Sequence, residues 1–119
     1  MSHAVLIIED EASLAKNMKQ YLDRHGFVVR AVTSAEDGLA QLDQYKPDAI
    51  LLDFHLPGMN GIQAIAKIRA LDSRIKMIMI TGHSSVQLAV DAMKAGAHEF
   101  LRKPVALSEI KRRLETALG

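Results

Sequence analysis

Short, almost wholly apolar runs alternate along this chain with longer segments of helical period. The apolar runs lie at 4–8, 27–32, 49–52 and 75–80, with a weaker one at 98–101. A short run that is apolar on both faces is typical of a strand buried in a parallel sheet. Because parallel strands need crossover connections, the alternation predicts an α/β fold: a five-stranded parallel sheet with helices on both faces.

The segments between the runs predict five helices. In each segment, apolar residues recur three or four positions apart and share one side. The five sets are Leu14, Met18, Tyr21 and Leu22; Ala35, Leu39 and Leu42; Ile62, Ile65 and Ala66; Val86, Ala89, Val90 and Met93; and Leu107, Ile110, Leu114 and Ala117. Left-handed C-terminal caps are expected at Gly26 and Gly96, and caps or first-turn residues at Ser34, Ser84 and Ser108.

The composition excludes several classes of protein. A chain of 119 residues suits one domain, and a hydrophobic content of 49% can fill a single core. There is no cysteine, so neither a disulfide nor a thiolate metal site can form. The net charge of +1 predicts no direct binding to nucleic acid or membrane, and no run is long enough to span a bilayer. We therefore expect one soluble, cytoplasmic domain over residues 1–119.

Polar residues follow three of the predicted strands at the point where each strand ends. Glu9 and Asp10 come directly after the first run, Asp53 comes after the third, and Thr81 comes after the fourth. The carboxyl ends of parallel strands share one edge of the sheet, and open α/β sheets bind their ligands at that edge. We therefore expect these side chains to meet there.

The acidic residues suit a hard dication and a nucleophile, but each also has an ordinary structural alternative. Two adjacent carboxylates are typical of a Mg²⁺ site. Alternatively, Glu9 and Asp10 cap the first helix; Glu11, which we place in its first turn, fits capping better. Asp53 can form an acyl phosphate, or it can start the turn around Pro57.

The remaining polar candidates suit a phosphoryl group. The hydroxyl of Thr81 can donate to a phosphoryl oxygen, and Gly82 lets the backbone approach an anion, unless the two only end a strand and begin a turn. Lys103 offers a compact cation, unless it is an ordinary surface lysine; Pro104 fixes the loop, in a trans or a cis bond. A net charge of −2, which one Mg²⁺ balances, comes from Glu9, Asp10, Asp53 and Lys103.

Four stretches of this sequence resemble the receiver domain of two-component response regulators. They are VLIIEDE at 5–11, LLDFHLPGMNG at 51–61, ITG at 80–82 and FLRKP at 100–104. Their order and spacing match the family over essentially the whole chain. The segment from 78 to 104 is similar to the receivers of NtrC-like, sigma-54-dependent activators. The resemblance implies a flavodoxin-like sheet with the strand order 2-1-3-4-5.

The resemblance also implies a phosphorylation site that uses Mg²⁺ as its cofactor. Asp53 would accept a phosphoryl group from the phosphohistidine of a sensor histidine kinase or of a histidine phosphotransfer protein. Asp10 would bind the ion directly, Glu9 mostly through water, and His55 through its backbone carbonyl. Glu9 stands where the family more often has aspartate, a side chain one methylene shorter.

Further roles in the switch follow from the same resemblance. Thr81 and Lys103 would hold the phosphoryl oxygens, and Phe100 takes the place of the switch aromatic, whose ring turns inward when the hydroxyl moves. The resemblance implies a phosphoacceptor signalling domain rather than an enzyme, although such a domain assists its own phosphorylation and dephosphorylation.

The implied output is a change in the surface of the fourth helix, fifth strand and fifth helix. That change would regulate transcription through a separate domain, with a homodimer formed on phosphorylation as one assembly. The alternative is a stand-alone receiver that acts through protein–protein contacts. We place Leu88 off the buried side of the fourth helix, as a contact on this surface or as an ordinary exposed apolar residue.

Two histidines stand at positions where the family varies. His55 and His83 lie two residues after Asp53 and Thr81. Either can control the access of water to an acyl phosphate, but two solvent-facing loop histidines are the commoner case. No third histidine or cysteine accompanies them nearby in the sequence, so we do not expect a transition-metal site.

Three rival classes fit less well. A haloacid dehalogenase phosphatase carries Asp-x-Asp after its first strand, whereas Asp53 follows the third and is succeeded two positions later by His55. A flavodoxin needs an anion-accepting loop after the first strand, where the acids at 9–11 would repel a phosphate. A receiver-like scaffold that never takes phosphate would not need the intact set of acids, hydroxyl and lysine.

Overall fold

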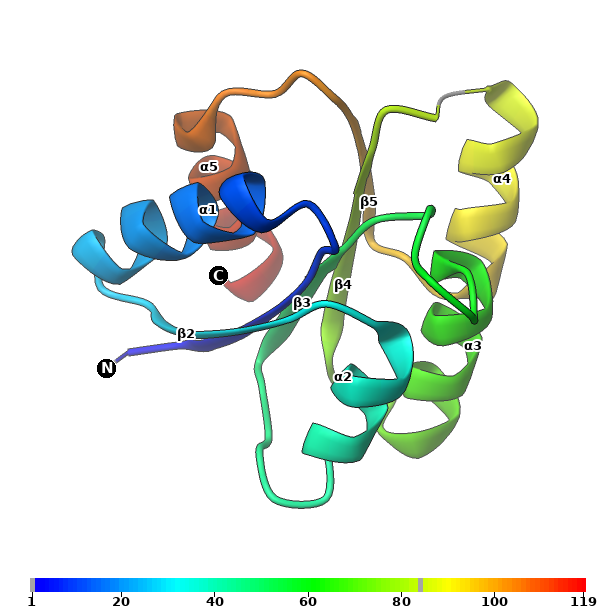
Figure 1. The fold of residues 1–119 in the computed structure, drawn as a ribbon, viewed down its shortest axis with the longest axis horizontal. Helices are drawn as coiled ribbons and strands as arrows, with labels where there is room; N and C mark the ends of the chain where they lie inside the picture. The colour runs from blue at the N-terminus through cyan, green and yellow to red at the C-terminus, as the bar shows by residue number, and fades with distance from the viewer. Residues whose placement is uncertain (1, 84) are drawn as a thin grey trace.

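The structure is a computed structural model that describes residues 2–83 and 85–119. The strands are β1 (Ala4–Ile8), β2 (Val28–Val32), β3 (Ala49–Leu52), β4 (Lys76–Thr81) and β5 (Glu99–Arg102). The helices are α1 (Ala12–Arg24), α2 (Ala35–Gln41), α3 (Gly61–Leu71), α4 (Val86–Ala95) and α5 (Leu107–Leu118). All strand pairs are parallel, in the order β2-β1-β3-β4-β5, which confirms the predicted fold (Figure 1). Ser84, one of the predicted caps, lies outside the described residues.

The sheet separates two apolar cores. Helices α1 and α5 cover one face, and α2, α3 and α4 cover the other (Figure 1). Side chains alternate between the faces along each strand, so Val5 and Ile7 enter the first core and Leu6 and Ile8 enter the second. The strands β1, β3 and β4 are buried on both faces, which explains why they are nearly continuous apolar runs in the sequence. Among the described residues, no helix is long and apolar enough to cross a membrane.

Helix α3 begins against the backbone that carries Asp53. Asn60 and Gln63 form a capping box, in which each side-chain oxygen accepts the backbone N–H of the other residue, at 2.9 and 3.0 Å. Gly61, the first residue of the helix, donates its N–H to the carbonyl of Phe54 at 2.8 Å. A β-carbon at Gly61 would collide with the carbonyl oxygen of Asp53. The helix can start at this point only because residue 61 has no side chain.

The substitution Gly61→Ala is therefore expected to destabilise the protein. Overpacking of this kind costs about 1–3 kcal/mol, and here the obstacle is backbone, which gives way less easily than a flexible side chain. Urea unfolding will measure the loss. Gly82→Ala is the matched control, because a β-carbon there has no heavy atom within 4 Å. Equal unfolding midpoints for the two variants would contradict the prediction.

The buried side of α4 differs from the prediction. Val86, Val90 and Met93, which we expected to face the core, are 85%, 39% and 47% exposed. The helix instead buries Ala92, and Leu88 is partly buried. Leu88, which we placed off the buried side of α4, is neither fully buried nor fully exposed, so its role as a surface contact stays a prediction. The polar residues Gln87, Asp91 and Lys94 share one side of the helix and the rest of its surface is apolar, so the periodicity allowed more than one inward side. The structure buries the side with the small Ala92.

At the other end of the sheet, His98 starts the pairing of β4 with β5. Its N–H donates to the carbonyl of Met77 at 2.7 Å, and its Nδ1 accepts the N–H of Met77 at 3.1 Å. Burial lowers the pKa of His98 below its ordinary value, and the positive charge of Lys76 lowers it further. The neutral ring is therefore the form that the fold favours.

We expect His98 to make the protein less stable in mild acid. A group whose pKa is lowered by folding contributes stability above its unfolded pKa of about 6.5, and that stability is lost as the pH falls through the folded value. The loss should not exceed the 0.5–1.5 kcal/mol, roughly, of one hydrogen bond. Urea midpoints on both sides of this pH will measure it. In His98→Gln, whose amide oxygen accepts but does not titrate, the pH slope should be flatter; identical slopes would contradict the assignment.

Candidate functional site

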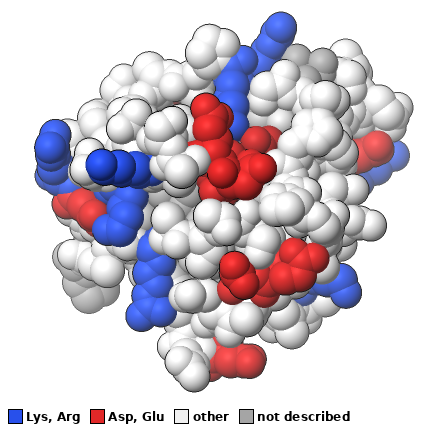
Figure 2. Space-filling model, in the orientation of Figure 1, with Lys and Arg blue, Asp and Glu red and all other residues white. Residues whose placement is uncertain are grey.

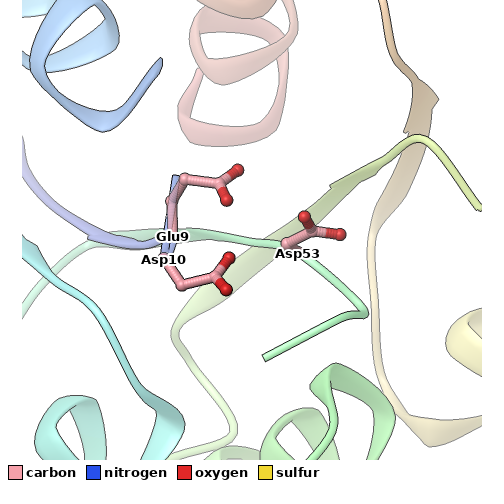
Figure 3. A group of neighbouring side chains, drawn as sticks. All are labelled: Glu9, Asp10 and Asp53. Atoms are coloured by element: carbon pink, nitrogen blue, oxygen red, sulfur yellow. The ribbon is translucent and has the colours of Figure 1, made fainter. Parts of the chain in front are cut away.

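The polar residues that follow the strands do meet at one edge of the sheet. Glu9, Asp10 and Asp53 each place a carboxylate oxygen within 4.8 Å of the others. Figure 3 shows the three side chains at the ends of two adjacent strands, with those of Glu9 and Asp10 extending toward the Asp53 side. Acidic side chains gather near the centre of this face of the molecule (Figure 2). Glu9 and Asp53 are buried, whereas Asp10 is exposed.

Backbone hydrogen bonds beyond the strand ends hold these acids in place. The N–H of Glu9 donates to the carbonyl of Val32 at 3.0 Å, and the N–H of Asp53 donates to the carbonyl of Ile8 at 3.3 Å. The pairing of β1 with both of its neighbours thus continues past the last strand residues. The position of each acid is therefore set by the rigid sheet rather than by a free loop.

Lys103 lies between two of the acids. Its Nζ donates to Glu9 Oε1 at 2.7 Å and to Asp53 Oδ2 at 3.0 Å, and it is 3.9 Å from Glu11 Oε2. Its backbone N–H donates to the carbonyl of Thr81 at 2.9 Å, and the peptide bond to Pro104 is cis. Burial opposes the charge on Lys103, but the hydrogen bonds that its ammonium donates to Glu9 and Asp53 outweigh this effect and raise the pKa of Lys103.

Burial dominates the electrostatics of Glu9. It raises the pKa of the carboxyl above its ordinary value, although hydrogen bonds from Lys103 and from the N–H of Glu11 oppose the shift. The charge on Asp53 raises that pKa further. An ionised Glu9 therefore lacks compensating positive charge even beside Lys103. A dication bound among these carboxylates would supply it.

Capping does not account for these acids. The N-cap residue of α1 is Glu11, which lies just before the helix and not inside its first turn as we expected. Its side chain makes no capping hydrogen bond. Glu9 Oε2 accepts the N–H of Glu11 at 3.2 Å, which orders the connection but leaves Oε1 to Lys103. Neither Glu9 nor Asp10 is the cap.

Thr81 ends β4 beside this group. It is 1% exposed, and its Oγ1 accepts the N–H of His83 at 3.1 Å. A β-carbon on Gly82 would meet open space, so the backbone there is accessible to an approaching anion. Phe100 lies on β5 opposite Met79 and packs, partly buried, against the second core. The roles predicted for these residues, for Pro104 and for the carbonyl of His55 stay predictions.

The two variable histidines touch each other, which no pattern in the sequence indicated. His55 Nε2 lies 3.0 Å from His83 Nδ1 and 3.2 Å from His83 Nε2. Their ring centroids are 4.0 Å apart, with an interplanar angle of 87°. Both residues are exposed, as expected, but they are not independent. The sequence could not indicate this contact, because 28 positions separate the two histidines and only the fold brings their loops together.

The strand order and the crossovers define the flavodoxin-like class of α/β domain. Within that class, a family model described as the response regulator receiver domain matches residues 5–115. This chain belongs to the receiver domain family of two-component response regulators. The resemblance to these receivers, including those of NtrC-like activators, is thereby confirmed.

Known relatives agree with this membership. The C4-dicarboxylate transport transcriptional regulatory protein DctD of Rhizobium meliloti is 37% identical over 107 residues, which cover 90% of this chain. The chemotaxis protein CheY of Bacillus subtilis is 31% identical over 122 residues, and the alignment covers the full length of both chains. A CheY-like receiver domain protein from Methanospirillum hungatei superposes with a TM-score of 0.95 at 29% identity, over 99% of this chain and 94% of its own.

The relatives differ in how much of their length this chain accounts for. It spans 23% of DctD and 50% of PrrA from Mycobacterium bovis, but all of CheY. Receiver domains of this family therefore occur both within longer regulators and alone.

Proposed function

We propose that this domain is a phosphoacceptor switch in a two-component phosphorelay, and that Asp53 takes the phosphoryl group. The observation that carries the proposal is the placement of the Lys103 ammonium between Glu9 and Asp53, at 2.7 and 3.0 Å. Phosphoryl transfer needs positioning and charge neutralisation more than covalent work by the protein. An acceptor carboxylate, a fixed cation and acids suited to a dication are gathered at one strand edge.

The carboxylate set suits Mg²⁺ as the cofactor. Mg²⁺ prefers oxygen ligands and retains several waters, which agrees with one exposed acid, Asp10, beside two buried ones. Asp10, Asp53 and the carbonyl of His55 would hold the ion directly, and Glu9 would hold it through water. When bound, the ion neutralises negative charge that develops on the phosphoryl oxygens.

The residues of the site divide the transfer among them. A carboxylate oxygen of Asp53 attacks phosphorus in line; the new P–O bond forms as the bond from phosphorus to the donor imidazole breaks. Lys103 then holds a phosphoryl oxygen. The hydroxyl of Thr81, which accepts from His83 in this structure, rotates to donate to another. Later attack by water resets Asp53. The domain thus assists its own modification and acts on no separate substrate.

The output is a shift between two conformations. Reversing a 1:99 equilibrium takes roughly 5.5 kcal/mol of differential affinity. Hydrogen bonds to charged groups contribute about 1.5–3 kcal/mol each, so those from Thr81, its neighbouring amide and Lys103 are sufficient together. We expect α4, β5, α5 and the ring of Phe100 to move. The exposed Val86, Val90 and Met93 supply the apolar part of this output surface, and the partly exposed Leu88 stays a candidate contact.

The phosphodonor is a sensor histidine kinase or a histidine phosphotransfer protein, and the signalling is cytoplasmic. We propose that the output is transcription control through a further domain, with a homodimer formed on phosphorylation; similarity to DctD, a transcriptional regulatory protein, supports this. The second candidate is a stand-alone receiver acting by protein contacts, which full-length similarity to CheY supports.

Intact-mass measurement tests the phosphoacceptor proposal. The protein is incubated with Mg²⁺ and acetyl phosphate, with and without a chelator. We expect the mass to rise by one phosphoryl group only when Mg²⁺ is free. No gain with acetyl phosphate or with a phosphorylated kinase would contradict the proposal and favour a receiver-like scaffold.

A further inference from the structure

Two imidazoles from different loops meet beside the acidic site. His55 belongs to the loop after β3, and His83 to the loop after β4. The closest approach of their ring nitrogens is 3.0 Å. The ring of Phe54 lies against both, with centroids 5.2 Å from His55 and 6.1 Å from His83. Both histidines are exposed and therefore accessible to a solute.

Backbone hydrogen bonds anchor each of the two histidines to the end of a strand. The N–H of His55 donates to Asp53 Oδ1 at 3.3 Å, and the N–H of His83 donates to Thr81 Oγ1 at 3.1 Å. Each histidine is thus fixed to a buried residue two positions earlier, at the end of a central strand. The rigid part of the fold therefore fixes the backbone of both histidines near each other, while their side-chain torsions stay free.

We propose that His55 and His83 form a two-imidazole site for a borderline transition-metal dication, Zn²⁺, Ni²⁺ or Cu²⁺. Metal–nitrogen bonds are about 2.0–2.1 Å, so two nitrogens on one ion are separated by roughly 2.9 Å at a right angle and 3.3 Å at a tetrahedral angle. His55 Nε2 lies 3.0 Å from His83 Nδ1 and 3.2 Å from His83 Nε2, so its separation from either nitrogen, one of which would bind the ion, falls between these values. Imidazole suits these ions, whereas Mg²⁺ prefers oxygen.

Only a small rearrangement is needed for both rings to bind one ion. The edge of His55 points toward the ring of His83, at 87° between the planes, so one ring must turn to direct its lone pair at a shared ion. That torsion is broad for histidine, and the exposure of the rings leaves it free. The nearby acids raise the local concentration of cations, and waters can complete the coordination.

This two-imidazole site differs from the proposed Mg²⁺ site in the type of its ligands. The sequence had led us to expect no transition-metal site, because no third histidine or cysteine accompanies His55 and His83. Two imidazoles already in contact need no such partner for moderate affinity. An ion there would stand beside the mouth of the acceptor site, where it would hinder both donor and water.

Isothermal titration of the whole chain with each of the three ions, in saturating Mg²⁺, tests the proposal. Wild type should bind one ion in excess of Mg²⁺, and the electron paramagnetic resonance spectrum of bound Cu²⁺ should show two coordinated nitrogens. Removing a residue that only supports a metal ligand lowers affinity roughly 10- to 100-fold. His55→Gln and His83→Gln each remove a ligand itself, so each should lower the affinity by at least that factor. His25→Gln, an exposed histidine on the far end of α1, should bind as wild type.

Three results would overturn the proposal. The first is an unchanged affinity in both His55→Gln and His83→Gln. The second is an equal loss of affinity in His25→Gln. The third is complete displacement of the transition metal by Mg²⁺, which would place that metal among the carboxylates. Thermal melts of each variant exclude unfolding as the cause. Since no step uses phosphorylation, failure here and failure of the phosphoacceptor proposal are distinguishable.

Discussion

Replacing Asp53 with asparagine will abolish the gain of a phosphoryl group. Lys103 and the N–H of His55 donate to different oxygens of Asp53, so the single oxygen of asparagine can keep one of these contacts but not both. The side chain keeps its size, so the fold should persist. Its amide lacks the negative charge and nucleophilicity that form an acyl phosphate. Intact mass after incubation with Mg²⁺ and acetyl phosphate will measure the loss, which we expect to be complete.

Asp43→Asn provides the matched control for this experiment. Asp43 is exposed in the turn just after the C-terminal end of α2, whereas the site lies at the strand edge from which α2 begins. The control should gain mass as wild type does. If Asp53→Asn were still modified, another residue would have to be the acceptor, and the assignment of the site would be wrong.

Replacing Lys103 with methionine should slow phosphorylation by about 10²–10³-fold. This is the usual cost of removing one preorganised group that stabilises developing charge. Methionine has a similar length but cannot donate to the phosphoryl oxygens. The time course of mass gain will measure the rate, and Lys111→Met, which loses only a surface contact with Glu115, is the control. A wild-type rate in Lys103→Met would remove this residue from the mechanism.

The same variant should show a pH-dependent loss of stability. Without the hydrogen bond from Lys103, the already raised pKa of Glu9 rises further. A carboxyl whose folded pKa is raised contributes stability below its unfolded pKa of about 4.5, and that stability is lost as the pH rises through the folded value. The variant should therefore match wild type best in acid and fall behind toward neutral pH. Urea unfolding without Mg²⁺ will test this.

Much of the candidate site could be predicted because strand ends in a parallel sheet share one edge. The positions of Glu9, Asp10, Asp53 and Thr81 directly after apolar runs were enough to expect their convergence. Their chemical roles came from the family resemblance and stay predictions. The sequence could not show that Lys103 Nζ contacts Glu9 and Asp53 together, since this depends on how β5 lies beside β4.

The orientation of α4 shows where periodicity fails. Its sequence, VQLAVDAMKA, is apolar on several sides, so the pattern did not choose among them. Contact with α3 and the sheet buries Ala92 and leaves Val86, Val90 and Met93 in solvent. For α1, whose polar and apolar sides are well separated, Met18 and Leu22 are buried as predicted.

By itself, the sequence determined the alternation of strands and helices, the burial of the sheet on both faces and the edge at which the acids lie. These properties are local, because each depends on residues within one strand or helix. Only the tertiary structure decided which side of α4 faces the core, which acids share Lys103, and that His55 meets His83. These depend on distances between segments far apart in the chain, which packing alone fixes.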